Sequence, residues 1–312
     1  MEIKLAMLGI LGLAGWIGCA PARAQEPAPP PPGAQALAEP LPPGPGSFLC
    51  PGADLQVFTY KPASYTDGPL LVVFHGVGRD ARAYRDHAIL MAERFRAIVA
   101  APLFDARRFG RDLYQRGGVL RQGQPQPADQ WTFARVAPLV AWIRRLEGRP
   151  DLPVYLIGHS GGGQFLERMA AFLPGEPCRI VAANPGTHLF PTRDLPFPFG
   201  FGGLPQHLGD DAAISAYLAA PLTLYLGTGD TVQDKDFDRS PAAMAQGSTR
   251  LERGRACFEM GRRLAADRHW PFNWRKVEVQ GVGHSAGRMF AQPEVEDALF
   301  STVPERPPAP LP

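Results

Sequence analysis

The sequence predicts an α/β fold with a mostly parallel sheet that helices cover on both faces. Two observations support this prediction: dense apolar runs recur along the chain, and segments with helical spacing of apolar residues fall between them. Runs that are apolar at every position suit strands buried on both faces, and their alternation with helices is typical of parallel sheets. The 312 residues are enough for one large domain of this class.

Each expected strand is a short apolar run. The runs LLVVFH, AIVAA, VYLIG, RIVAA and LTLYLG are dense, whereas WRKVEVQ alternates and therefore indicates a strand nearer the edge of the sheet. The expected strands cover residues 55–60, 70–75, 97–101, 154–158, 179–183, 222–227 and 274–280.

The expected helices lie between these strands, at residues 82–95, 129–146, 160–173 and 250–266. The second has the clearest pattern, because its apolar residues recur every three to four positions from Trp131 to Ile143. Asp129 is expected to cap its first turn.

The two ends of the chain differ in composition from its middle. Residues 1–24 combine Lys4, an apolar run and an A-x-A site, which predicts a secretory signal and export to the periplasm or medium. Cys19 offers an alternative, a lipid-anchored form, although the residues before it fit a lipoprotein site poorly. Residues 25–47 predict a Pro/Ala-rich flexible linker, residues 48–303 the folded domain and residues 304–312 a disordered tail.

Charge and cysteine content narrow the functional classes. The formal net charge of +2, with cationic residues spread along the chain, gives no indication of a nucleic-acid partner or of stable membrane insertion. Cys50, Cys178 and Cys257 match no metal-binding spacing. Export would allow one disulfide among these three, and the sequence leaves the pairing open.

Ser160 is the candidate nucleophile. It is the central residue of Gly158-His159-Ser160-Gly161-Gly162, a G-x-S-x-G motif between an expected strand and an expected helix. A sharp strand-to-helix turn forces the serine into a strained conformation, and the glycines remove the clashes that the turn would create. The helix that follows directs its free N–H groups and positive dipole end to the same point.

A serine hydroxyl needs a base, and the base needs a carboxylate to fix its tautomer. His284, just after the last expected strand, is the candidate base, and Asp230, three residues past the strand at 222–227, is the candidate acid. Asp234 and Asp236 on the same loop are alternatives for that acid. The expected oxyanion hole consists of two backbone N–H groups. One belongs to Gly161, the residue after the serine, and the other to Val77, in the loop after LLVVFH where Gly76 allows a close approach of the backbone.

With these residues the sequence resembles the α/β-hydrolase superfamily, and within it secreted bacterial esterases related to poly(3-hydroxyalkanoate) depolymerases. The stretches that carry the resemblance are FHGVGRDARAYRD (74–86), IGHSGGGQF (157–165), AMAQGSTRLERG (243–254) and GVGHSAGRM (281–289). The resemblance covers about residues 55–300. Ser285 stands where members of that group often carry Asp after the histidine.

Two long connections are candidates for substrate contact. Residues 188–209 fall between two core strands, where this fold usually has a cap, and Phe190, Phe197, Phe199 and Phe201 are the expected apolar wall of the substrate site. The alternative is a loop that attaches itself to the surface through these aromatic residues. Residues 105–124 carry five arginines, which either bind a carboxylate of the substrate or are simply solvated.

These observations predict a secreted serine hydrolase that cleaves carboxylic esters, small or polymeric, through an acyl-enzyme on Ser160. The scheme requires neither a metal nor an organic cofactor. Two alternatives remain: a peptidase or amidase that uses the same three residues, and a binding protein without catalysis on a hydrolase scaffold. The sequence does not indicate an oligomeric state.

Overall fold

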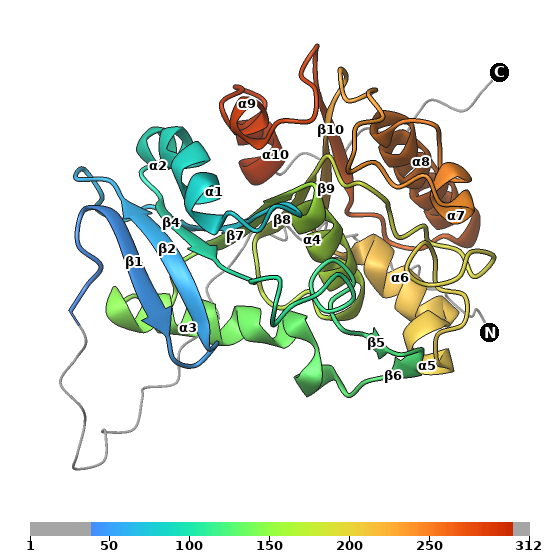
Figure 1. Cartoon of the computed structure of the whole chain (residues 1–312), viewed down its shortest axis with the longest axis horizontal. Coiled ribbons are helices and arrows are strands. Elements are labelled where there is room, and N and C mark those ends of the chain that lie inside the picture. Colours follow the sequence, from blue (N-terminus) through green and yellow to red (C-terminus); the bar gives the residue numbers. More distant parts are fainter. Residues whose placement is uncertain (1–38, 302–312) are drawn as a thin grey trace, which may run out of the picture. The chain divides into compact units, whose positions relative to one another are not determined.

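The computed structural model describes residues 39–301, which contain an eight-stranded sheet (Figure 1). The strands run across the sheet in the order β1 (Gly44–Cys50), β2 (Leu55–Lys61), β4 (Ile98–Pro102), β3 (Leu70–Phe74), β7 (Val154–His159), β8 (Arg179–Ala183), β9 (Leu222–Gly227) and β10 (Arg275–Val279). The pairs β1–β2 and β2–β4 are antiparallel and all others are parallel. The predicted mostly parallel sheet is therefore confirmed.

The seven predicted strands are all present. Every residue of β3, β4 and β9 is buried, as the dense apolar runs predicted. The last predicted strand, β10, lies at one edge, and most of its residues are half-buried. Its alternating sequence reflects this position, because one face of an edge strand remains near solvent.

Helices cover both faces of the sheet. On one side lie α1 (Ala81–His87), α2 (Ile89–Phe95), α9 (Ala286–Phe290) and α10 (Val295–Phe300), whose apolar residues form one buried cluster with β3 and β4 (Figure 1). On the other side α3 (Val136–Leu146), α4 (Gly161–Phe172), α6 (Asp211–Ala219) and α8 (Arg250–Arg268) form a second, larger cluster. The sheet is thus the middle of three layers.

Shorter elements occupy the connections. They are the strands β5 (Leu120–Arg121) and β6 (Gln124–Pro125), the 3₁₀ turns η1 (Ala128–Gln130) and η2 (Thr132–Arg135), and the helices α5 (Gln206–Gly209) and α7 (Pro241–Met244). Within residues 39–301, no helix has the length and apolar character needed to cross a membrane.

The predicted helix at 129–146 begins later than expected. Residues 128–135 form two 3₁₀ turns, α3 starts only at Val136, and Asp129 lies in η1 without capping α3. Pro138 gives the physical reason. A helix from residue 129 would need an N–H at Pro138 to bond the carbonyl of Ala134, and proline has none, so this residue is tolerated only in the first turn. The predicted helix at 82–95 is likewise two helices, which meet at Ala88.

The amino-terminal boundary of the domain also differs from the prediction. β1 begins at Gly44, and Leu41 is buried in the larger core cluster, so residues 41–47 belong to the fold and not to the predicted linker. Glu147, at the end of α3, accepts a hydrogen bond from the Leu41 backbone N–H at 3.0 Å. The predicted signal at 1–24 and tail at 304–312 lie outside the described residues.

Within residues 39–301, neither Cys50 nor Cys257 takes part in the disulfide that export would allow. Cys50 and Cys257 are separate buried thiols, one at the end of β1 and the other within α8. Burial raises the pKa of the Cys257 thiol, and the neighbouring Glu167 carboxylate raises it further.

Candidate functional site

Ser160 lies at the sharp turn between β7 and α4. Its backbone has φ 56° and ψ −115°, a region that a non-glycine residue rarely occupies. Glycine neighbours make this turn possible. A methyl group on Gly158 would lie 2.5 Å from the backbone of Gly162, and one on Gly162 would lie 2.3 Å from the carbonyl oxygen of Phe74. The G-x-S-x-G sequence is therefore required by close backbone contacts.

His284 and Asp230 meet although 54 residues separate them. The Nδ1 of His284 lies 2.7 Å from the Oδ2 of Asp230, whose side chain is buried. The imidazole itself is partly exposed and therefore accessible to a ligand. Of the two alternative acids, Asp234 pairs with Arg250 and Asp236 is exposed, so Asp230 is the carboxylate in contact with the histidine.

The His284 ring also lies beside the serine turn. Its centroid is 4.6 Å from the ring of His159, the residue directly before Ser160. Ser285 caps α9 by accepting a hydrogen bond from the backbone of Arg288, which helps to fix the loop that carries His284. The structure therefore brings together the loops that follow the carboxyl ends of β7, β9 and β10, which is where parallel α/β folds bind ligands.

The Val77 amide faces Gly161 across a narrow gap. A methyl group on Gly161 would lie 3.2 Å from the backbone nitrogen of Val77, and one on Gly76 would lie 3.6 Å from the Ser160 Cβ. Gly161 is also the first residue of α4, so its N–H is free of helical hydrogen bonding. The two predicted oxyanion donors thus lie together beside the serine.

Two further histidines near the turn are buried and neutral. His75 donates from Nδ1 to the carbonyl of Gly76 and accepts at Nε2 from the backbone N–H of Phe104, which fixes the loop that carries Val77. Burial lowers the pKa of His75 to about 4. Burial likewise lowers the pKa of His159 well below its ordinary value, and its Nδ1 lies 3.3 Å from the Tyr84 hydroxyl. Both histidines support the structure of the site.

Two of the solved structures that are similar to this chain are about a third identical to it in sequence. No protein-family model matches the chain. No curated protein matches it either. Among solved structures, poly(aspartic acid) hydrolase-1 from Sphingomonas sp. KT-1 is 35% identical with a TM-score of 0.74, over 80% of this chain and 96% of that one. LpqC, a poly(3-hydroxybutyrate) depolymerase from Bordetella parapertussis, is 34% identical with a TM-score of 0.72, over 80% of this chain and 87% of that one. The chain belongs to the α/β-hydrolases related to depolymerases.

The cap loop of this hydrolase, residues 188–209, is attached to the core by its phenylalanines. Phe190, Phe199 and Phe201 are buried, and the partly buried Phe197 packs against the larger core cluster. The rings of Phe197 and Phe201 lie 5.8 and 5.7 Å from that of Phe172, at the opposite end of α4 from Ser160. Phe197 and Phe201 therefore pack far from the serine along α4, which corrects their predicted place in an apolar wall over Ser160. Substrate contact by Phe190 and Phe199 stays a prediction.

A buried carboxylate holds the same loop to three helices. Glu167 of α4 accepts hydrogen bonds from the Leu189 backbone N–H at 3.0 Å and from the Tyr217 hydroxyl of α6 at 3.3 Å, and its oxygens lie near His188 Nδ1 and Cys257 Sγ. Glu167, His188 and Cys257 are metal-ligand types and lie within 4.8 Å of one another. The donors converge on Oε1, whereas Oε2 accepts no hydrogen bond within the described part of the chain and lies 3.0 Å from His188 Nδ1. Through the bonds from Leu189 and Tyr217, the carboxylate is an anchor for the loop.

The arginines of the loop at 105–124 mostly pair with acids of the hydrolase itself. Arg111 binds Asp238, Arg108 binds Asp54 and Arg116 binds Asp112. These pairs favour the alternative in which the arginines serve the fold and the surface, and not a substrate carboxylate.

A cavity of about 610 Å³ has walls that include none of Ser160, Asp230 and His284. Its walls come from the start of α3, the start of β7 and the last turn of α4, and include Phe133, Val140, Met169 and Leu173. Since β7 begins there and ends at the serine turn, a ligand in this cavity would lie roughly 20 Å from Ser160.

Two site residues were missed by the sequence reasoning. Tyr84 contacts His159, and Arg250, the first residue of α8, lies 3.5 Å from Asp230 and pairs with Asp234. Arg250 falls within the stretch 243–254 that carries the family resemblance, which was the available signal.

Proposed function

We propose that this hydrolase cleaves carboxylic esters through an acyl-enzyme on Ser160. The observation that carries the proposal is the 2.7 Å contact between His284 and Asp230, beside the strained serine turn. Asp230 fixes the proton on Nδ1 of His284, so that Nε2 is free to take the proton of the Ser160 hydroxyl. The hydroxyl oxygen then attacks the acyl carbon.

The remaining steps follow from the same groups. The N–H groups of Val77 and Gly161, together with the positive end of α4, stabilise the negative charge on the acyl oxygen. His284 returns its proton to the leaving alcohol, and a water molecule activated by the same histidine releases the acid. The proposal includes an exported protein, on the basis of the signal-like sequence at residues 1–24.

Amide hydrolysis is the second candidate function. The relative with 35% identity is a poly(aspartic acid) hydrolase, and the one with 34% identity is a depolymerase of a polyester. A serine nucleophile can attack the acyl carbon of an ester bond or of an amide bond. Cleavage of the amide additionally requires protonation of a poorer leaving group.

The test is a substrate panel with the wild type and Ser160→Ala. The panel contains poly(3-hydroxybutyrate), poly(aspartic acid), p-nitrophenyl butyrate and the matching anilide. We expect the wild type to cleave the two esters faster than the two amides, and the variant to lose at least about 1,000-fold in kcat. Preference for poly(aspartic acid) would establish the second function. A fully active Ser160→Ala variant would rule out the mechanism.

A further inference from the structure

Arg250 is buried directly behind the candidate catalytic carboxylate. Its side chain is 1% exposed, and its Nη1 lies 3.5 Å from Oδ1 of Asp230, the oxygen that does not contact His284. The same guanidinium binds both oxygens of Asp234, at 2.8 and 3.0 Å, and donates to the carbonyl of Val232 at 3.2 Å. Arg250 therefore connects the carboxylate beside His284 to a second, more exposed carboxylate.

The position of Arg250 is fixed from several directions. It is the first residue of α8, whose N-cap Thr249 accepts a hydrogen bond from the Glu252 backbone N–H. Its guanidinium lies 5.3 Å from the centre of the Phe237 ring, and the backbone N–H of Leu251 donates to the carbonyl of Asp230. A cation held so rigidly keeps its charge at a constant distance from Asp230.

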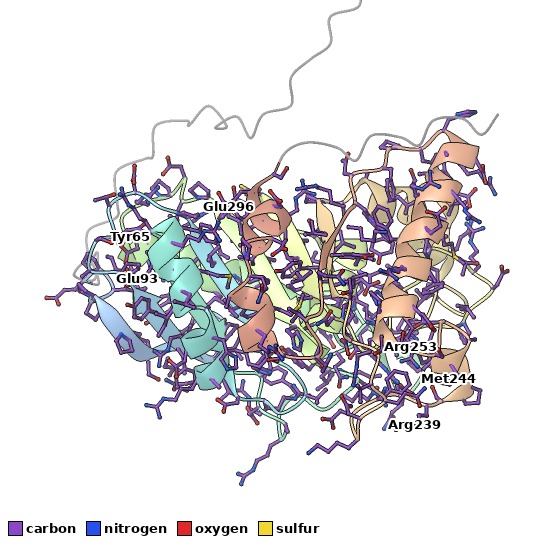
Figure 2. The ribbon with its side chains drawn as sticks, turned by 90° about the horizontal axis from the view of Figure 1, so that it is seen from above. Tyr65, Glu93, Arg239, Met244, Arg253 and Glu296 are labelled. Atoms are coloured by element: carbon purple, nitrogen blue, oxygen red, sulfur yellow. The ribbon has the colours of Figure 1, made fainter. Side chains whose placement is uncertain are left out.

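Arg253, one turn further along α8, offers a natural comparison. It is also fully buried and stacks on the same Phe237 ring at 4.1 Å, but it binds the carbonyls of Gly186, Asp238 and Gly247 and no carboxylate. Figure 2 labels Arg253 with its neighbours Met244 and Arg239, where the loop after β9 meets α8. Arg253 thus has the burial and packing of Arg250 without the contact to Asp230.

We propose that Arg250 is a positioning residue whose charge favours the ionised form of Asp230 and the neutral form of His284, and that Asp234 is the counter-ion that offsets part of this charge. This inference rests on the proposed function. A positive charge behind Asp230 stabilises the ionised carboxylate and opposes protonation of His284. Asp234 offsets part of that charge, so the pair Arg250–Asp234 determines how readily His284 stays neutral and able to act as a base.

Other titratable groups also face His284, and of these the test changes Asp234 alone. His159 lies against its ring from β7, and burial together with the charges of His284, Arg250 and His87 holds the pKa of His159 below its usual range. Asp230, which contacts His284, and Asp234, which interacts with its charge, come from the loop after β9. Arg250 contacts Asp230 directly, and its charge also contributes to the lowered pKa of His159.

The experiment measures the rate at which a fluorophosphonate labels Ser160 as a function of pH. The serine oxygen bonds to phosphorus, fluoride leaves and His284 takes the proton, so the acid limb of the profile reports protonation of the base without a known substrate. In Arg250→Met we expect the acid limb to move to higher pH by about one unit. In Asp234→Asn we expect it to move to lower pH, because the arginine loses its counter-charge.

Arg253→Met is the matched control, in which we expect reduced stability and an unmoved acid limb. Thermal melts identify any variant that fails to fold. Asp234 is partly exposed, and its asparagine variant preserves shape, so this variant decides the question if Arg250→Met does not fold. An acid limb unmoved in Asp234→Asn, or moved in the same direction as in Arg250→Met, overturns the inference. A wild-type protein that is not labelled at any pH overturns the proposed function instead.

Discussion

Two adjacent glycines beside Ser160 have different roles. A methyl group on Gly162 would lie 2.3 Å from the carbonyl oxygen of Phe74, a rigid part of the sheet. One on Gly161 would meet the Val77 side chain and amide at 3.2 Å, in the space between the two proposed oxyanion donors. Gly162 is therefore needed for the fold, and Gly161 is needed for access to the candidate site.

Substitution of the two glycines should separate stability from activity. We expect Gly162→Ala to lower the free energy of unfolding by about 3 kcal/mol or more, because backbone must move to relieve the contact. We expect Gly161→Ala to fold normally and to lose roughly 100-fold in kcat/KM on an ester substrate. Urea unfolding and steady-state kinetics measure the two effects. Equal stability of both variants would contradict the assignment.

The residues of the candidate site were largely predictable, because a serine turn, a histidine and an aspartate each follow a recognisable strand end. Arg250 was not, since an arginine in the first turn of a charged helix looks solvated in the sequence. Its burial depends on Asp234, Phe237 and the loop that folds back over α8. The prediction for Phe197 and Phe201 was wrong for a related reason, because aromatic rings suit a ligand pocket and a core equally well.

At the scale of elements, Glu167 joins four segments that the sequence separates. It lies on α4 and accepts from the cap loop at Leu189 and from α6 at Tyr217, while Cys257 of α8 lies 3.6 Å away. The central strands could be predicted because burial on both faces leaves a continuous apolar run. β1 could not, because GPGSFLC pairs on one side only and contains a Gly-Pro-Gly turn signal.

Removal of the Glu167 carboxylate should weaken this junction. We expect Glu167→Ala to lower the free energy of unfolding by about 3 kcal/mol or more, because several buried donors lose their acceptor. Cys257→Ser, which retains a donor at the edge of the same cluster, should cost about 1 kcal/mol. Urea unfolding at neutral pH measures both variants. A smaller loss for Glu167→Ala than for Cys257→Ser would contradict the anchor role.

At the scale of the whole molecule, the buried neutral histidines make stability depend on pH. Burial lowers the pKa of His75 to about 4, compared with 6.5 for an ordinary histidine. Below pH 6.5 the unfolded chain therefore takes up a proton that the folded chain does not bind. The contribution of His75 is complete above that pH and is lost as the pH falls toward 4. His159 acts in the same direction.

We expect His75 alone to lower the free energy of unfolding by about 3 kcal/mol as the pH falls from neutral to about 4. Urea unfolding at several pH values measures this slope. His75→Gln, which cannot take up the proton, should have a lower stability at neutral pH and a shallower slope. The same slope in the variant and the wild type would show that other groups cause the pH dependence.

The contact between Leu41 and Glu147 determines the direction from which the chain enters its domain. Glu147 follows α3, and Lys61, at the end of β2, binds the same carboxylate, so this corner lies where the parallel strands start. Ser160 lies where one of them finishes. A carrier protein or solid support joined at residue 41 would consequently attach at the opposite ends of the strands and leave the Ser160 turn unobstructed.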